Sequence, residues 1–241
     1  MLIAAAVCPH PPLLVPEVTG ANGPSADGPG AGELRRLRAA CREAVAVLLG
    51  AAPELLVVVG GAEHTAEYPP AAGGGLRDFA VPFTLGADPL LPLSLTVGKW
   101  LLAATAMESQ KIAWWGMASG AATADCLNLG EKLAALAPRV ALLALGDGPG
   151  RRARGVPGAA DPGADRYDDQ VTAALAAADP GALAALDPRG DEELVVAGRA
   201  AGQVLAGAAS RGAFAADLRY AAAPFEVSYY VATWVRAHQG H

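Results

Sequence analysis

The chain is poor in cysteine, histidine and aromatic residues, and it has no long apolar run. Its 241 residues include 3 cysteines, which form neither a CxxC pair nor an even set for disulfides. This usage is typical of the reducing cytoplasm, where we expect the chain to reside. No apolar run reaches the roughly 18 to 20 residues of a membrane span. The N-terminus has no basic segment and reaches Pro9 too early for a signal peptide, so we expect no membrane partner.

Positive charge is also scarce. The chain has 18 Lys and Arg against 24 Asp and Glu, a net charge of −6. Because nucleic-acid binding depends on clustered Lys and Arg, we expect no nucleic-acid partner. The hydrophobic fraction of 53% is typical of a globular protein with a sizeable core. Neither an internal repeat nor a dividing linker is visible, so we expect one domain over residues 1–241.

The apolar pattern predicts strands alternating with helices. Apolar residues at helical spacing predict helices at 33–49, within 91–107, and at 122–136, 165–178 and 192–209. Short apolar runs predict strands at 4–8, 55–59, 79–84, 111–117 and 140–145, and within 217–234. This alternation predicts an α/β fold, with a central mostly parallel or mixed sheet flanked by helices.

Two of the 4 histidines follow predicted strands. His10 stands between Pro9 and Pro11, which stiffen the backbone just after the first strand. On this segment alone, a proline-rich turn with a solvent-facing histidine is an equal alternative. His64 follows the strand at 55–59. A right-handed β–α–β unit would make these strands neighbours and bring their carboxyl ends to one edge, so we expect both histidines in one crevice.

Two histidines and a carboxylate form the facial arrangement that binds non-haem Fe(II). His10 and His64 are candidates for two of these ligands. Glu193 at the start of a predicted helix and Glu226 near the last strand are candidates for the third, although each is also explained as a surface charge. Glu63 is either a carboxylate supporting His64 or a solvated side chain.

Two other residues near the expected crevice could carry chemistry. Asp147 follows a buried strand and is a weak catalytic candidate, with an Asx turn in a glycine-rich loop as the alternative. Cys8 is either a soft metal ligand or oxidisable thiol that supports the site, or a small buried hydrophobe. The chain lacks GxGxxG, GxxxxGK[ST], HExxH and GxSxG motifs, so we expect neither nucleotide binding nor serine hydrolysis.

Three segments resemble the class III extradiol dioxygenase catalytic-subunit (LigB-like) superfamily. They are the CPHPPLL run at 8–14, the EHT run at 63–65, and the closing segment at 223–234. More narrowly, the chain is similar to an uncharacterised actinobacterial branch of that superfamily. The resemblance spans most of the chain. It implies a single α/β domain around a central sheet and cleavage of catechol-type rings with Fe(II) and dioxygen.

The resemblance assigns roles to some residues and leaves others empty. It implies that His10 is the first iron ligand and His64 the second. The superfamily's third ligand is a glutamate opening a late helix, which corresponds here to 197–208, and Glu193 lies about a turn too early. The superfamily's acid/base histidine has no counterpart between residues 65 and 237. Asp147 lies in a comparable place, but a normal aspartate pKa of about 4 suits catechol deprotonation poorly.

Three hypotheses follow from these observations. The chain is a divergent dioxygenase that uses Fe(II) or another divalent metal on a small catechol-type aromatic. Alternatively it is a non-catalytic member of the same fold, like the Memo branch, with a degenerate metal site, no cofactor, and a ligand or protein partner. In the third hypothesis, the chain is a generic α/β domain and the histidine pair has no joint role. Homo-oligomers are compatible with each hypothesis.

Overall fold

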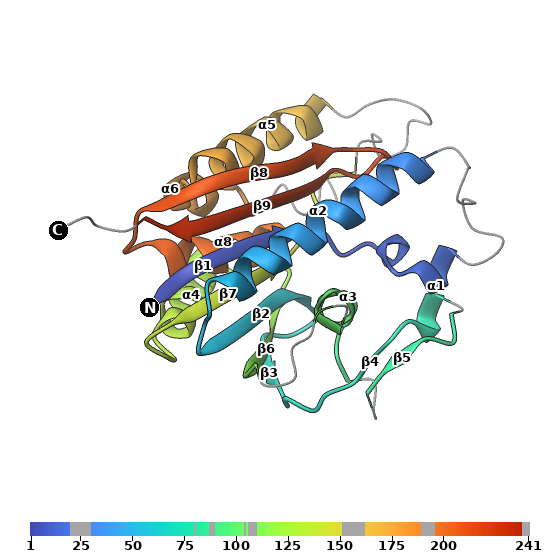
Figure 1. Cartoon of the computed structure of the whole chain (residues 1–241). Coiled ribbons are helices and arrows are strands. Elements are labelled where there is room, and N and C mark those ends of the chain that lie inside the picture. The colour runs from blue at the N-terminus through green and yellow to red at the C-terminus, as the bar shows by residue number, and fades with distance from the viewer. Residues whose placement is uncertain are drawn as a thin grey trace.

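In the computed structural model, a central sheet lies between two layers of helices (Figure 1). The structure describes residues 1–19, 30–79, 81–86, 90–103, 105, 110–150, 162–188 and 196–237. The strands are β1 Leu2–Cys8, β2 Leu55–Ala62, β3 Ala66–Tyr68, β4 Gly74–Gly75, β5 Thr84–Leu85, β6 Ile112–Ala118, β7 Val140–Leu145, β8 Phe214–Ala222 and β9 Tyr229–Arg236. The α-helices are α1 Pro16–Thr19, α2 Ala31–Gly50, α3 Leu93–Ala103, α4 Thr123–Ala134, α5 Pro162–Ala177, α6 Pro180–Ala184 and α8 Arg199–Ala209. Short 3-10 helices are η1 Pro12–Leu14 and η2 Arg77–Phe79.

Seven strands form one mixed sheet in the order β3-β6-β2-β7-β1-β9-β8. The four strands β6, β2, β7 and β1 run parallel to one another. At the flanks, β3 pairs antiparallel with β6, and β9 pairs antiparallel with both β1 and β8. The predicted α/β class with a mixed sheet is therefore confirmed.

The parallel strands β1 and β2 are not neighbours, which corrects the arrangement expected from sequence. Strand β7 lies between them and pairs with both. All six residues of β7 are buried, because the strand occupies the sheet centre with helices on both faces. A β–α–β unit determines that two strands are parallel, but it leaves open whether a later strand inserts between them.

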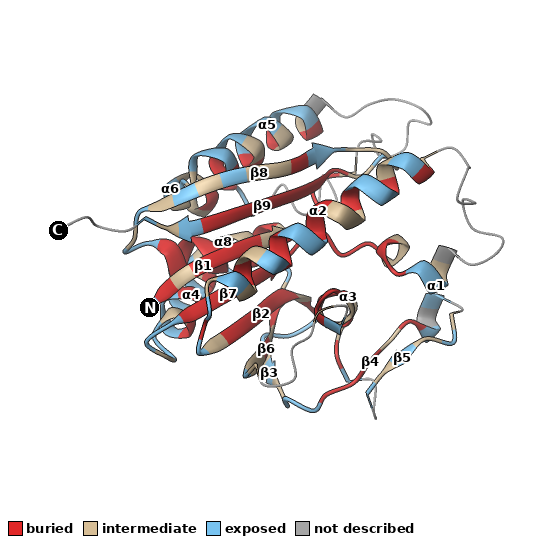
Figure 2. Cartoon of the chain, viewed as in Figure 1, coloured by how far each residue is buried: buried red, intermediate tan, exposed pale blue. Residues whose placement is uncertain are grey.

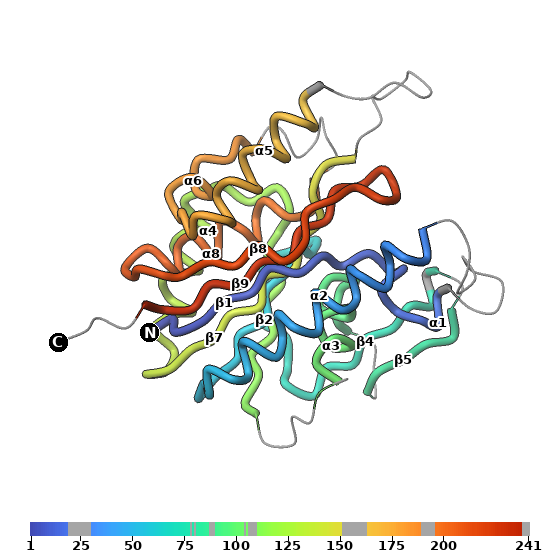
Figure 3. Tube along the Cα trace, turned by 45° about the horizontal axis from the view of Figure 1, so that its top comes forward, coloured from blue at the N-terminus to red at the C-terminus, as the bar shows by residue number. Residues whose placement is uncertain are grey.

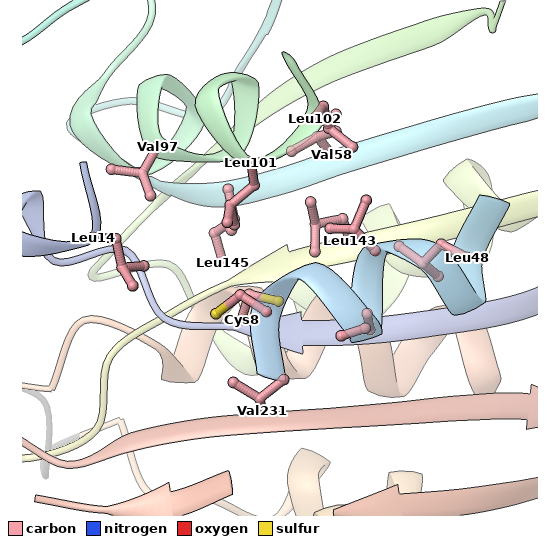
Figure 4. Packing of buried hydrophobic residues seen from close by; sticks show 14 of the residues in the cluster. Cys8, Leu14, Leu48, Val58, Val97, Leu101, Leu102, Leu143, Leu145 and Val231 are labelled. Atoms are coloured by element: carbon pink, nitrogen blue, oxygen red, sulfur yellow. The ribbon is translucent and has the colours of Figure 1, made fainter. Parts of the chain in front are cut away.

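Each face of the sheet has its own apolar cluster. One cluster packs α2 and α3 on the sheet and includes Cys8, Leu48, Leu101 and Leu143 (Figure 4). The other cluster joins the opposite face to α4, α5, α6 and α8. Figure 3 shows these two helix groups on either side of the strands, and Figure 2 shows that the buried residues line both interfaces.

Most predicted elements form near their predicted positions, and two differ. In place of the strand expected at 79–84, the structure has η2 and then β5, which begins at Thr84. Pro82 cannot donate a ladder hydrogen bond, so regular pairing starts only after it. The helix expected at 192–209 is observed as α8 from Arg199, and residues 189–195 lie outside the described part. None of the helices in the described ranges is both long and apolar enough to cross a bilayer.

Two glycines allow α4 and α8 to pack backbone against backbone. A Cβ atom on Gly130 would lie 2.0 Å from the Val204 carbonyl oxygen. A Cβ atom on Gly207 would lie 2.1 Å from the Leu127 carbonyl oxygen. Any side chain at either position would force the helices apart, and α8 covers the centre of one sheet face. The glycines therefore determine how closely this layer packs.

We predict that Gly130→Ala lowers the free energy of unfolding by about 2 kcal/mol or more, because the added methyl overlaps backbone atoms. Gly202→Ala in α8 is the matched control, since a Cβ atom there meets nothing within 4 Å. It should stabilise the protein by about 0.5–1 kcal/mol, the usual preference for alanine in a helix. Urea denaturation of both variants measures the difference, and equal stabilities would contradict the close packing of α4 on α8.

Candidate ligand site at the carboxyl edge of the sheet

The parallel strands β1, β7 and β2 end at one edge of the sheet. In the ladder, Cys8 pairs with Leu145, and Leu145 pairs with Gly60. His10 and Asp147 therefore each follow the end of a strand by two residues, and these two strands are neighbours. The carboxyl edge is where open α/β sheets usually bind ligands.

Asp147 extends the β1–β7 ladder by one bond through its side chain. The Gly146 N–H donates to the Cys8 carbonyl at 3.0 Å, which is ordinary parallel pairing. The next acceptor in a regular ladder would be the Gly146 carbonyl. Here the His10 N–H donates instead to Asp147 Oδ1 at 2.7 Å. The same oxygen lies 3.5 Å from His10 Nδ1. The structure thus joins two of the residues singled out in the sequence.

Both side chains of this pair are nearly buried. The relative exposure is 10% for the His10 side chain and 16% for Asp147. Burial raises the pKa of the Asp147 carboxyl, and the nearby His10 partly offsets this increase. His10 Nδ1 is a buried atom with no hydrogen-bond partner in the described part of the chain. With a proton on Nδ1 facing Asp147, the Nε2 atom is left as an acceptor for a ligand hydroxyl.

His64 does not share this buried environment. It follows β2, which is separated from β1 by the whole width of β7. Its side chain is 83% exposed and that of Glu63 is 89% exposed. His64 Nε2 lies 3.7 Å from Glu63 Oε1, and both side chains are at the surface. His10 is nearly buried and His64 is exposed, so the two imidazoles do not lie in one enclosed crevice.

The remaining metal candidates do not complete a site either. Glu226 is exposed in the β8–β9 turn with a φ of 61°. Glu193 lies outside the described residues. Within the ranges that the structure covers, no group of three His, Cys, Asp or Glu side chains could hold a metal ion. The described residues therefore do not fit the Fe(II) site that the resemblance implies, whose three protein ligands must converge.

Cys8 is the last residue of β1, two residues before His10, and is fully buried, like Cys41 on α2. A hydrogen bond with Cys8, together with burial, raises the pKa of the Cys41 thiol well above its usual value. Cys8 itself packs in the apolar cluster in Figure 4, as a small buried side chain. Tyr229 is buried nearby, and burial together with the Asp147 charge raises the pKa of its phenol.

A buried arginine that the sequence pattern did not single out cross-links this edge. Arg199 at the start of α8 is 1% exposed. Its guanidinium donates to the carbonyls of Ser119 at 2.8 Å and Ala121 at 3.0 Å, just beyond β6. It also donates to Gln203 Oε1 at 2.7 Å. The sequence signal that could have identified Arg199 is its spacing from Gln203, since the two polar residues lie at i and i+4 on the apolar face of a helix.

Glycines let α8 approach the loop that carries Asp147. A Cβ atom on Gly146 would lie 2.4 Å from the Gly198 Cα, so the two backbones touch. Beside this crossing, Asp147, Arg199 and Tyr230 help to line a cavity of about 30 Å³. That volume suits a single water molecule and is too small for an aromatic ring. A larger ligand must therefore contact the exposed atoms of His10 and Asp147 from outside this cavity.

Comparisons with known proteins add little to this picture. No family model matches the chain, and no curated protein matches it. One solved structure, "Crystal structure of uncharacterized protein JW3007 from Escherichia coli K12", has 16% sequence identity and a TM-score of 0.49. The match covers 96% of this chain and 99% of that one. The site itself defines an α/β protein with a buried histidine–aspartate pair at its carboxyl edge.

We predict that Asp147→Ala and Asp147→Asn differ in stability. Alanine leaves the buried His10 N–H without its acceptor, which should cost about 1–3 kcal/mol. Asparagine keeps a side-chain oxygen for this bond, so Asp147→Asn should lose clearly less stability than Asp147→Ala. Chemical denaturation at neutral pH measures both variants. Equal losses would show that the bond across β1 and β7 contributes little to the fold.

We also predict a pH dependence that Asp147→Asn removes. The folded-state pKa of Asp147 lies above its unfolded value, so the folded state binds the proton more tightly. This contribution to stability is fully present below the unfolded pKa of about 3.9 and is lost as pH rises through the folded pKa. From about pH 4 upward, the wild-type protein should lose stability relative to Asp147→Asn. Urea unfolding of both across this pH range gives the difference, and parallel curves would contradict the raised pKa.

Proposed function

We propose that this chain binds a small hydroxylated aromatic ligand at the carboxyl edge of its sheet, as a non-catalytic relative of the LigB-like proteins it resembles. The observation that carries this proposal is the shared Asp147 oxygen, 2.7 Å from the His10 backbone nitrogen and 3.5 Å from His10 Nδ1. The backbone bond holds the carboxylate rigidly beside the imidazole. A rigid, nearly buried donor and acceptor pair can recognise a ligand hydroxyl with little ordering cost.

The chemistry of the pair suits a phenolic hydroxyl. The hydroxyl can donate to His10 Nε2 or to a carboxylate oxygen, and both groups can exchange a proton with it. The raised pKa of the Asp147 carboxyl favours sharing that proton over full charge separation. A cytoplasmic location is part of this proposal, and the three free, buried cysteines support it.

Iron-dependent cleavage of a catechol-type ring is the second candidate. It is favoured by the placement of His10, a ligand in the superfamily that the chain resembles, at the end of β1. Two nitrogen or oxygen ligands of one ion at about 2.0–2.2 Å each lie roughly 3–3.5 Å apart, and the His10 Nδ1 to Asp147 Oδ1 distance is 3.5 Å. This candidate requires a third protein ligand beyond the described residues, such as Glu193.

Calorimetric titration of the metal-free protein with catechol tests the proposal. We expect one binding site whose affinity falls about tenfold or more in His10→Ala and in Asp147→Asn, because each loses a hydrogen bond in a desolvated place. His64→Ala is the matched control, since that imidazole is exposed, and its affinity should stay within about twofold of wild type. Circular dichroism establishes that each variant is folded.

The same protein loaded anaerobically with Fe(II) distinguishes the two candidates. We expect less than one bound iron per chain and no oxygen uptake with catechol. One iron per chain that His10→Ala removes, together with oxygen uptake and a yellow ring-cleaved product, would establish the dioxygenase instead. Absence of catechol binding in both the metal-free and the loaded protein would overturn the proposal.

A further inference from the structure

A larger cavity lies at the opposite, amino edge of the sheet. Its volume is about 680 Å³, within the roughly 300–1,000 Å³ of small-molecule sites. It is bounded by the ends of α4 and α8, the start of β1 and the end of β9. The seven residues of β1 separate this edge from the carboxyl edge, about 20 Å at 3.3 Å per residue. The cavity is therefore distinct from the site of His10.

The inner wall of this cavity is apolar. Leu2 is 1% exposed and Ala208 is 8% exposed. Gly207, Ala134 and Ala135 complete this surface with small residues. Such a wall offers no hydrogen bonds to a ligand, so the part of a ligand that lies on it must be hydrocarbon.

The rim of the cavity carries more positive than negative charge. The cationic side chains are those of Lys132, Arg211 and Arg236, and the anionic one is that of Glu131. This local excess contrasts with the chain's net charge of −6. Arg211 lies 3.6 Å from Glu131, and both side chains are largely accessible at 86% and 49% exposure, so this ion pair is weak. A ligand anion can compete for such an arginine.

Arg236 is the most rigid of these cations. Its Nη1 donates to the Leu2 carbonyl at 3.0 Å and its Nη2 to the Arg211 carbonyl at 3.2 Å. Its guanidinium carbon also lies 5.8 Å from the centre of the Phe214 ring. A guanidinium has five N–H donors, so this orientation still leaves donors for a planar carboxylate. In the described part of the chain, Arg236 forms no ion pair with a carboxylate.

Helix ends account for only part of this charge. Lys132 lies in the last turn of α4 and Arg211 follows the end of α8, where cations offset the partial negative charge of free carbonyls. Arg236 belongs to β9 and is held by a strand carbonyl at Leu2. Its position is not explained by a helix dipole. It adds a cation beside an apolar wall.

From this combination we propose that the amino-edge cavity binds a small organic anion, a carboxylate carried on an apolar body. The carboxylate contacts Arg236 and Arg211, with Lys132 close by. The hydrocarbon lies against Leu2 and Ala208. This site does not depend on the function proposed for the carboxyl edge.

Calorimetry with octanoate tests this proposal, with octanol and octylamine as the neutral and cationic comparisons. Wild-type protein should bind octanoate in preference to both. The double variant Lys132→Gln/Arg211→Gln should bind octanoate about tenfold more weakly or worse, because charge-assisted hydrogen bonds are lost. Lys111→Gln is the matched control, since this exposed lysine precedes β6 at the same edge but does not line the cavity. Its affinity should match wild type.

Ala135→Trp provides a second variant, which places a bulky side chain in the cavity from an exposed position and leaves the charged residues unchanged in sequence. It should also abolish octanoate binding, whereas His10→Ala should leave it unchanged. Backbone amide shifts on octanoate addition should concentrate at Leu2, Ala208 and Arg236. The proposal is overturned by undetectable binding at about 10 mM octanoate, by full affinity in both cavity variants, or by amide shifts confined to the carboxyl edge.

Discussion

The insertion of β7 between β1 and β2 is the constraint on which the rest of the structure depends. Its backbone pairs with both neighbours, and all six of its residues are buried. This placement brings Asp147 to the end of β1, where it bonds to His10. It also separates His10 from His64 by a full strand. One strand therefore creates the observed pair and prevents the expected one.

Because the polar groups of the carboxyl edge are buried, their hydrogen-bond partners matter for the stability of the fold. A carboxyl, an imidazole and a guanidinium are each expensive to remove from water without partners. Asp147 meets this requirement by accepting from the His10 backbone N–H, and Arg199 meets it by donating to carbonyls beyond β6. Among the described residues, the His10 imidazole has only the Asp147 carboxylate nearby, at 3.5 Å. These bonds also tie β1, β7, β6 and α8 together at one place. These bonds restrain the edge, as the ligand recognition proposed there requires.

The two edges of the sheet differ in their chemistry. The carboxyl edge presents an acid beside an imidazole, with a cavity of about 30 Å³ next to Asp147. The amino edge presents cations around an apolar cavity of about 680 Å³. The ligands that we propose for the two surfaces differ accordingly, a hydroxyl-bearing ring at the carboxyl edge and an organic anion at the amino edge. A parallel sheet produces this difference because opposite ends of its strands are connected by different loops and helix ends.

Local pattern determined most of the longer elements of this protein, because periodicity of apolar residues needs no knowledge of neighbours. The all-apolar run at 140–145 predicted β7 with its observed bounds, and the run at 33–49 predicted α2 closely. The sequence also placed His10 and Asp147 after strand ends. Strand order, the meeting of these two residues, the exposure of His64 and the burial of Arg199 were decided only by the tertiary structure. Each depends on which distant segments pair across the sheet, and no short-range pattern contains that information.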